Sequence, residues 1–490
     1  MCDEGTLELP ARRPADKDVG GLPRGEVRSW RPRGRSEYSL VCLTLLFALP
    51  CTAAADDVSA RSSAEGAAST QAVTPAPDIE QRFAVHGQAT YGQQWTDAFN
   101  SPYAGTNSLS PSSSRETVDA TLFVGARLWR GAEAWVTPEL DQGFGLDDTL
   151  GVAGFPSGLA YKIGAHDPYF RLPRAFVRQT INDAGETEAV NGLAGQLAGS
   201  HSRDRWVITL GKFSVTDVFD TNQYAHDPRV DFLNWAVVDT GTFDYAADPW
   251  GYTLGLAVER YSGDWTFRAG VFDLSEIPNS EPLAHGFEEF QLVGEIERRY
   301  ELFGQSGRVL VTAFESRGRM ALLQDAINLA LATGTTPDPA AVRQYRSRAG
   351  IGVSLEQPLS TDLGVFARVG KGDGNTEVYE FTDIDRTIAL GAALRGTRWH
   401  RPADVLGAAI VANGISAVRQ QYLNLGGLGI LVGDGKLPHP GAEQILESYY
   451  SLGALSWLYV TVDYQWVKNP AYNTDRGPAS IFGLRVHAQF

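Results

Sequence analysis

The carboxyl-terminal segment constrains the fold of this chain more than any other feature of the sequence. Apolar side chains occupy every second position: Phe482, Leu484, Val486, Ala488 and Phe490. Between them lie Gly483, Arg485, His487 and Gln489. Successive side chains of a β-strand point to opposite faces, so this strand has one apolar face and one mixed face. Such a strand fits a sheet whose outer face meets lipid, with the terminal aromatic ring at the membrane interface.

The same period of two recurs in short segments from Gln81 onwards, separated by Gly, Asp, Asn and Pro turns. A helix would place apolar residues three and four positions apart. Residues 320–333 (MALLQDAINLALAT) do so, which predicts a short helix in a loop. The sequence predicts an all-β fold, a transmembrane antiparallel β-barrel over residues 81–490 with about sixteen strands, eighteen being also compatible. The clearest strand segments are residues 83–91, 118–128, 132–137, 252–259, 265–271 and 458–466.

The connections between these segments fall into two length classes. Short ones occur at Gly131, 262–264 and 396–397. Short periplasmic turns at one end and long extracellular loops at the other are typical of bacterial outer-membrane barrels. The sequence contains no run of 18 apolar residues, which argues against membrane-spanning helices. The long connections are predicted at residues 141–172, 214–248, 318–345 and 414–442.

The first 55 residues are interpreted as a targeting region. Residues 40–49 (LVCLTLLFAL) form a short apolar core that follows three arginines, and small residues at 52–55 would suit cleavage before Asp56. This pattern is typical of a secretory signal peptide. We also hypothesise that translation starts after about residue 36, so that the first segment is a start-site artefact. Residues 56–80, rich in Ala, Ser and Thr, are predicted to be a disordered leader.

The net charge limits the kind of partner. With 42 basic and 58 acidic residues the chain carries −16, which argues against nucleic acid as a partner. It leans weakly towards cations or neutral solutes in a pore. In the outer membrane the expected partners are lipid and lipopolysaccharide. The strand pattern fits a monomer and a symmetric trimer equally well.

A barrel of sixteen strands encloses a water-filled channel, and the polar half of each strand lines it. Carboxylates and guanidinium groups hydrogen-bond hydroxyls, and aromatic rings stack on the apolar faces of sugars, so the lining suits a neutral polyhydroxylated solute. Any water-filled lumen is polar, however, so composition alone favours sugars only slightly. The candidate lining residues are Arg127, Glu133, Trp135, Arg174, Arg178, Glu259, Arg268, Glu295, Glu297, Arg368 and Asp463.

Two His-Asp-Pro motifs, at residues 166–168 and 226–228, allow a metal-binding interpretation. A loop turn, with Asp capping and Pro fixing the backbone, is the favoured interpretation of both. The scattered carboxylates form no recognisable catalytic arrangement. No catalytic, cofactor-binding or metal-binding residue is therefore predicted, and the chain is not expected to be an enzyme.

Several ordered strings resemble the carbohydrate-selective porins of the OprB family, over about residues 83–490. The resemblance implies a sixteen-stranded barrel through which mono- or small oligosaccharides diffuse passively across the outer membrane. It also implies that inward-folded loops narrow the channel, and the loops after Glu139 and after Phe213 are the candidates. The strings are residues 211–215 (GKFSV), 217–220 (DVFD), 224–229 (YAHDPR), 232–236 (FLNWA), 244–248 (DYAAD), 447–450 (ESYY), 463–465 (DYQ) and 469–473 (NPAYN).

Two other functions stay open on the sequence. One is a porin of the same fold for other small polar or ionic solutes. The other is a secreted β-rich protein that binds or cleaves polysaccharide.

Overall fold

The computed structural model describes residues 80–160, 164–284 and 286–490. The predicted signal peptide and all of the predicted leader except Glu80 lie outside these ranges. Within them, no helix is both long and apolar enough to cross a membrane.

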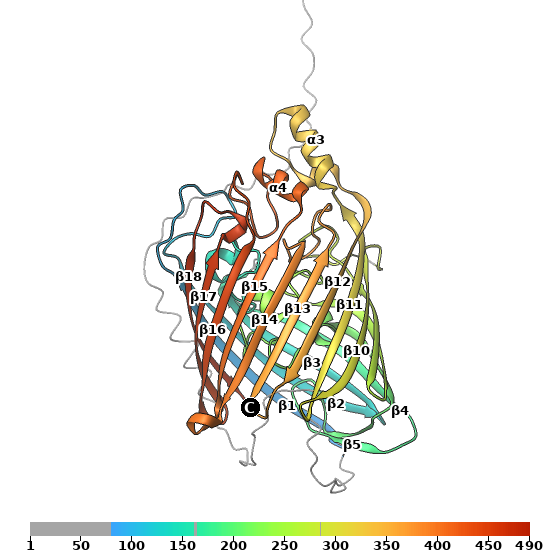
Figure 1. Cartoon of the computed structure of the whole chain (residues 1–490). Helices are drawn as coiled ribbons and strands as arrows, with labels where there is room; N and C mark the ends of the chain where they lie inside the picture. Colours follow the sequence, from blue (N-terminus) through green and yellow to red (C-terminus); the bar gives the residue numbers. More distant parts are fainter. Residues whose placement is uncertain (1–79, 161–163, 285) are drawn as a thin grey trace, which may run out of the picture. The chain divides into compact units, whose positions relative to one another are not determined.

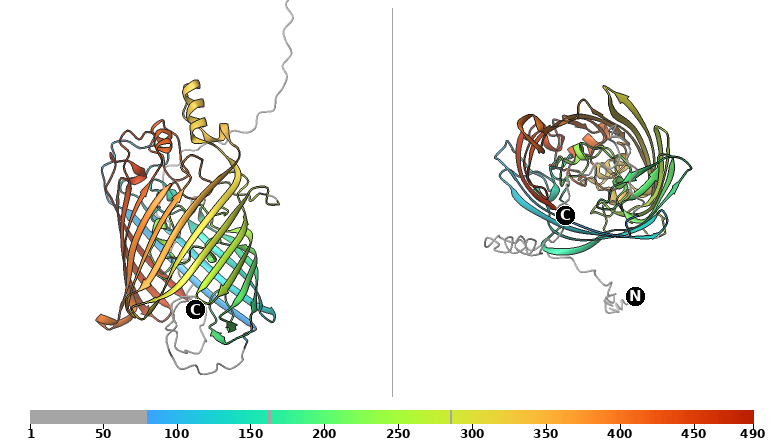
Figure 2. Two further views of the ribbon diagram at one scale, coloured as in Figure 1. Left: turned by 45° about the vertical axis from the view of Figure 1, so that its right-hand side comes forward. Right: turned by 90° about the horizontal axis from the view of Figure 1, so that it is seen from below.

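Sixteen antiparallel strands close into a barrel, each paired with its neighbours along the chain and β1 with β18 (Figures 1 and 2). The predicted number of sixteen is confirmed, and two further short strands, β5 (Thr187–Val190) and β6 (Gly199–Ser202), form a separate sheet. The barrel strands are β1 (Phe83–Thr96), β2 (Ser114–Trp129), β3 (Ala132–Gly143), β4 (Ala165–Asn182), β7 (Arg205–Phe213), β8 (Thr253–Ser262), β9 (Trp265–Asp273), β10 (Phe290–Leu302), β11 (Gln305–Met320), β12 (Gln344–Pro358), β13 (Leu363–Gly372), β14 (Arg386–Gly396), β15 (Arg401–Gly414), β16 (Glu443–Leu455), β17 (Leu458–Lys468) and β18 (Ala479–Gln489).

The carboxyl terminus forms the seam of the barrel. The N–H of Gly87 donates to the carbonyl of Phe490 and the N–H of Phe490 to the carbonyl of Gly87, both at 2.9 Å. The ring of Phe490 lies over Gly87, where a Cβ would approach its Cζ to 2.3 Å, so any side chain at Gly87 would displace the ring. Phe490 is 67 % exposed in the isolated chain, which suits a ring at the lipid interface.

Apolar and polar side chains alternate across the wall as predicted. Leu210 on β7 and Val462 on β17 face outwards and are 61 % and 57 % exposed. Their neighbours Thr209 and Asp463 face inwards and are buried. A closed sheet satisfies every backbone group of the wall, so the apolar outer face can meet hydrocarbon.

The two ends of the barrel differ in the length of their connections. The short turns lie at the end that carries the carboxyl terminus, and the long loops, with helices α3 and α4, lie at the other (Figure 1). The predicted loop helix is confirmed as α3. The helices and single turns of helix are η1 (Leu146–Thr149), η2 (Val215–Asp217), α2 (Trp235–Val238), α3 (Leu323–Thr333), η3 (Pro339–Val342), η4 (Thr397–Trp399), α4 (Ala417–Asn424) and η5 (Pro470–Tyr472).

Strand β4 corrects two predictions. It begins at Ala165, so the loop predicted over 141–172 is shorter, and His166–Pro168 belong to a strand instead of a loop turn. Pro168 and Pro173 obscured the strand, because proline cannot donate to a ladder. The pairing of β4 with β3 is irregular at both places, which lets β4 keep the two prolines.

A second departure lies at the short-turn end. The connection from β4 to β7 occupies residues 183–204 and contains the β5–β6 hairpin. The other connections at this end are short, as between β2 and β3 or between β8 and β9. The hairpin carries little apolar alternation, so the period-two pattern gave no sign of it.

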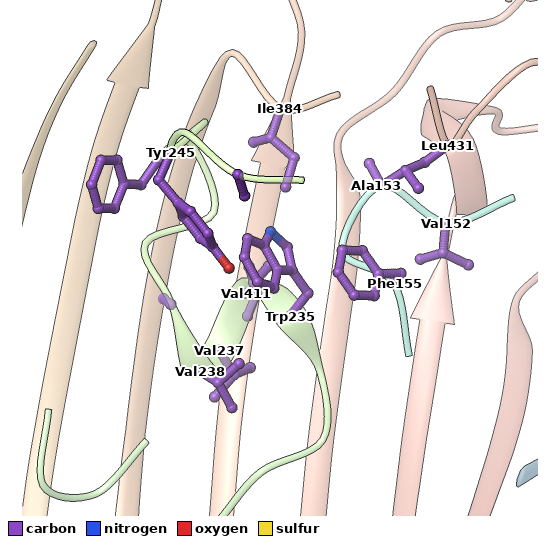
Figure 3. Packing of buried hydrophobic residues seen from close by; sticks show 14 of the residues in the cluster. Val152, Ala153, Phe155, Trp235, Val237, Val238, Tyr245, Ile384, Val411 and Leu431 are labelled. Atoms are coloured by element: carbon purple, nitrogen blue, oxygen red, sulfur yellow. The ribbon is translucent and has the colours of Figure 1, made fainter. Parts of the chain in front are cut away.

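The hydrophobic core lies inside the barrel, where two long loops pack against each other. Phe155 from the β3–β4 loop stacks on Trp235 of α2 in the β7–β8 loop, with ring centroids 5.0 Å apart (Figure 3). Val237 and Tyr245 of the second loop are also buried. Burying side chains of this size stabilises by about 1.5–3 kcal/mol each. The two loops named from the family resemblance therefore do fold into the lumen.

Candidate functional site: the channel through the barrel

One half of the barrel wall holds the inward-folded loops through their backbone. The Glu443 carboxylate on β16 accepts the N–H groups of Ala153 and Gly154 at 3.0 and 2.8 Å. Glu447, four residues further along the same face of β16, accepts the N–H groups of Leu233 and Asn234 at 2.5 and 3.2 Å. Buried backbone donors need such partners, so these two carboxylates fix the position of both loops.

Strands β10, β13 and β18 contribute to the same anchoring. Glu295 on β10 accepts the N–H of Asp220 at 2.7 Å. Arg368 on β13 donates to the carbonyl of Val237. Arg485 on β18 donates to the carbonyls of Pro228 and Asp231 at 2.7 and 2.8 Å.

These inward-facing charges are buried, and burial of a charge is tolerated only with good partners. The loop backbone supplies those partners. The polar inner face of this half is therefore occupied by the loops.

The other half of the wall borders an open cavity of about 1010 Å³. Its strand residues come from β1–β4, β7–β9 and β11, and in the described part of the chain none comes from β12–β18. Residues of the β7–β8 loop border it, and so do residues of the β5–β6 hairpin. The cavity therefore extends from the level of the inward-folded loops towards the periplasmic end.

A bidentate ion pair and two aromatic rings lie together in this half. Arg174 on β4 donates to both carboxylate oxygens of Asp217, at 2.8 and 2.6 Å. Its guanidinium lies 4.9 Å from the ring centroid of Tyr252. Arg171, three residues earlier and across the irregularity in β4, lies 5.3 Å from the ring centroid of Trp250 and pairs with Glu139 at 2.5 Å. The group presents hydrogen-bonding groups beside flat apolar surfaces.

The loop carboxyl of this group is ionised. Burial alone would raise the pKa of Asp217, but the guanidinium of Arg174 and the N–H of Ser214 outweigh burial and hold this pKa below its usual value. Asp217 therefore stays negative at neutral pH and keeps Arg174 in place.

A second pair lies nearby in the β7–β8 loop. The Nδ1 atom of His226 lies 3.6 Å from Asp239. Burial would lower the pKa of His226, but the hydrogen-bonding and charge interactions with Asp239 together outweigh burial and raise this pKa. Arg229 from the same loop donates to Asp119 on β2 at 2.9 Å.

The lining is close to neutral in charge, although the chain carries −16. Eight arginines and seven carboxylates border the cavity. Most of these arginines pair with a carboxylate, as in Arg178–Glu133 at 2.9 Å and Arg268–Glu259 at 2.9 Å. The net charge left cations and neutral solutes open, and this nearly neutral surface fits neutral solutes better.

The eleven predicted lining residues separate into two groups. Six of them border the cavity: Arg127, Glu133, Arg174, Arg178, Glu259 and Arg268. The other five face inwards without bordering it: Trp135, Glu295, Glu297, Arg368 and Asp463.

Two of these five, Glu295 and Arg368, anchor the β7–β8 loop as described above. Glu297 bridges Arg268, Arg299 and Arg308, with its carboxylate 2.9 Å from each of the first two. The side chain of Trp135 is fully buried, and Asp463 accepts from Gln465 at 3.1 Å.

Five residues of the group around Arg174 were not on that list: Arg171, Asp217, Arg229, Trp250 and Tyr252. Asp217, Arg229 and Trp250 lie in the β7–β8 loop, where no strand alternation marks a facing direction. Tyr252 was predicted as the first residue of the strand 252–259, but β8 begins at Thr253 and Tyr252 is buried. Arg171 lies in the part of β4 that was predicted as loop. Asp217 and Arg229 fall within the strings that carry the family resemblance, which was the only signal for them.

The structure describes no metal site in the ranges it covers, since no group of three or more His, Cys, Asp or Glu is arranged to hold an ion. The Asp227 carboxylate instead accepts the N–H of Arg229 at 2.9 Å, as a loop turn requires. The turn interpretation of residues 226–228 is confirmed.

A closed barrel with an apolar outer face, inward-folded loops and a polar internal cavity defines an outer-membrane porin. The family model of the carbohydrate-selective porins, OprB family, matches residues 107–490, and the chain belongs to this family. It is thus a sugar-selective channel of the outer membrane and not an enzyme, which excludes the secreted polysaccharide-binding alternative.

One solved structure supports the fold, and two others are reported with it. The chain is similar to the high-pH structure of Pseudomonas putida OprB, with 16 % identity and a TM-score of 0.63, over 84 % of this chain and 94 % of that one. The low-pH structure of the same protein gives 12 % identity and a TM-score of 0.45, over 84 % and 93 %. Salmonella typhi OmpF in complex with daunomycin gives 11 % and 0.46, over 84 % and 100 %. No curated protein sequence matches the chain.

Proposed function

We propose that neutral mono- and small oligosaccharides diffuse passively along the cavity beside strands β1–β9. The observation that carries this is the group of Arg171, Arg174, Asp217, Trp250 and Tyr252, in which charges are paired beside two aromatic rings. A sugar needs both kinds of contact, because its hydroxyls form hydrogen bonds and its C–H faces are apolar.

The bidentate Arg174–Asp217 pair has a specific part in this proposal. Its geometry is fixed, so it offers donors and acceptors to hydroxyls without having to reorganise. Hydroxyls exchange water for these groups at little net cost, which keeps binding weak enough for release. The rings of Trp250 and Tyr252 supply the apolar contact.

The alternative is a porin that passes other small polar or ionic solutes. It predicts a lumen with an excess of one charge, because an ion is selected by opposite charge. The eight arginines and seven carboxylates of the lining favour a neutral solute instead.

Planar-bilayer conductance tests the proposal. Ion current through the purified channel is expected to fall as glucose or maltose is added, and to recover when the sugar is removed. The reversal potential in a salt gradient is expected to lie close to zero. A current that sugars leave unchanged, with a strong bias for one ion sign, would overturn the proposal in favour of the ionic alternative.

We further propose that the outer face binds outer-membrane lipid and, at the extracellular end, lipopolysaccharide. Arg317, Lys371 and Arg386 lie near that end on β11, β13 and β14 and are exposed. Each lies two positions from an outward-facing apolar or acidic residue, as Lys371 does from Val369. Guanidinium and ammonium groups at this level suit the phosphates of lipid A.

Native mass spectrometry of the purified protein tests this partner. The triple variant Arg317→Gln, Lys371→Gln, Arg386→Gln is expected to lose bound lipopolysaccharide. The control Arg298→Gln, at the opposite end of β10, should keep it. Equal retention in both variants would overturn the proposal.

Residues 1–55 are proposed to be removed on export, and the mature amino terminus is then Asp56. Intact mass of the precursor and of the mature protein tests both this site and the proposed later start; a precursor mass that includes Met1 would refute the later start.

A further inference from the structure

The β4–β7 connection, residues 183–204, lies at the periplasmic end of the barrel. Figure 1 shows β5 at the lower end, where the carboxyl terminus also lies. Two residues suffice for the turn between β2 and β3 at the same end. Joining β4 to β7 therefore does not require a connection of this length, which points to another role for the extra residues.

The tip of the β5–β6 hairpin is fastened to the inner face of the wall. The N–H of Leu197 donates to Glu133 on β3 at 2.9 Å. Arg178 on β4 donates both to Glu133 and to the carbonyl of Gly195, at 2.9 Å each. Arg127 on β2 donates to the carbonyl of Ala198 at 3.0 Å. Three inward-facing side chains from three strands thus hold the tip against the lumen wall.

The amino-terminal end of the barrel strengthens this attachment. The N–H of Gln81 donates to the carbonyl of Ala198 at 3.0 Å, and the N–H of Ala198 donates to the side chain of Gln81 at 2.8 Å. Leu197 is only 3 % exposed. The tip is therefore hydrogen-bonded both to the wall and to Gln81.

The hairpin borders the same cavity as the Arg174–Asp217 pair. Gly195, Gln196 and Leu197 of its tip are among the residues that border the cavity. A solute that follows this cavity therefore contacts the hairpin.

We propose that the β5–β6 hairpin forms a second constriction, in series with the inward-folded extracellular loops, that limits the size of the sugar released into the periplasm. The inference rests on the cavity as the sugar path. Its size limit comes from the hairpin backbone and small side chains, and Arg127, Glu133 and Arg178 act as positioning residues that keep the tip in the lumen.

Replacing residues 184–203 by Asn-Gly gives the most direct test. Conductance is expected to rise, and liposomes should swell in sugars too large for the parent channel, in a series from glucose through maltose to maltotriose and larger maltodextrins. Heat-modifiable migration on gels checks that the variant barrel is folded. An unchanged size limit in a folded variant would overturn the proposal.

Point variants test the same size limit if the deletion variant does not fold. Arg127→Ala with Arg178→Ala releases the tip, and is expected to raise the size limit in the same direction as the deletion. The matched control is Arg203→Ala, which lies in the same connection but pairs with Asp264 at an exposed position. Equal size limits for the double variant and the control would refute the positioning role.

Cysteine labelling locates the tip directly, in a chain whose Cys2, Cys42 and Cys51 are replaced by serine. A charged methanethiosulfonate reagent is expected to reduce the current through Gln196→Cys, which borders the cavity. It should leave Glu186→Cys, at the exposed base of the hairpin, unchanged. No reduction at Gln196 would overturn the inference, whereas a parent channel without sugar-sensitive conductance would instead refute the proposed path.

Discussion

The two halves of the barrel wall have the same alternation but use their inner faces differently. Along β12–β18, inward-facing charges such as Glu443, Glu447 and Arg485 bind the backbone of the two inward-folded loops. Along β1–β9, inward-facing charges such as Arg174 and Arg178 border an open cavity. The two halves therefore use their inward-facing charges differently, and the loops packed against each half decide how.

Removing a loop anchor should have the largest effect. Glu447→Ala leaves the N–H groups of Leu233 and Asn234 without an acceptor, at about 1–3 kcal/mol each. The β7–β8 loop should leave the wall, so that conductance rises several-fold and sugar no longer reduces the current. Bilayer recordings and unfolding in urea measure the two effects.

The control for this variant is Glu315→Ala on β11, a carboxylate that is exposed and lies outside the cavity. It should retain the parent conductance. If Glu447→Ala also retained it, the loops would not depend on the β12–β18 half.

A charge introduced on the outer face should destabilise both halves of the wall to the same extent. Leu210→Arg on β7 and Val462→Arg on β17 each place a charge in the apolar outer face, and each should lower the free energy of unfolding by about 2–4 kcal/mol near the bilayer midplane. Unfolding in lipid vesicles measures both. A loss confined to one half would mean that the other half meets protein instead of lipid.

In the cavity half, a charged residue should affect solute binding more than the fold. Arg174→Ala removes the bidentate pair with Asp217, and loss of charge-assisted contacts of about 1.5 kcal/mol would weaken the sugar block about tenfold. Sugar titration of single-channel current measures this. Lys371→Ala, outside the lumen, is the control, and equal affinity in both variants would contradict the role of Arg174.

The smallest expected effect is a dependence of ion selectivity on pH. Asp239 raises the pKa of His226 despite burial, so His226 gains its proton as pH falls through a value above about 6.5. Protonation of Asp231, whose pKa burial raises to about 6, removes a negative charge in the same range. Reversal potentials should therefore shift towards anions between pH 8 and pH 5.

His226→Gln should remove the part of this shift that occurs at higher pH. The part due to Asp231, at lower pH, should remain. The surrounding charges of Asp227, Asp239 and Arg368 are unchanged in that variant. An identical pH profile with and without His226 would exclude it as the titrating group.

The sequence predicted the wall well because lipid imposes a strict period of two on the outer face. The number of strands, the terminal strand β18 and the helix α3 all follow from local pattern. Inward direction was also predictable, since Arg368 and Asp463 do face inwards. The sequence did not predict that these two residues lie outside the cavity. That depends on where distant loops pack, such as the loop that contains α2.

The parts that the sequence did not reveal share one cause. Asp217, Trp250 and Tyr252 lie in an irregular loop, and the β5–β6 hairpin lies in a connection without apolar periodicity. Their positions are set by hydrogen bonds to side chains far along the chain, such as Glu133. No local pattern encodes such a contact.

Cysteine accessibility at one matched pair tests the division of the wall most directly. Thr180→Cys on β4 borders the cavity, and Ser451→Cys on β16 faces inwards in the other half, each in the periplasmic part of its strand. With the native cysteines replaced, a charged thiol reagent should reduce the single-channel current through Thr180→Cys and leave Ser451→Cys unchanged. Equal reduction at both positions would show an open path along β12–β18 and contradict the account.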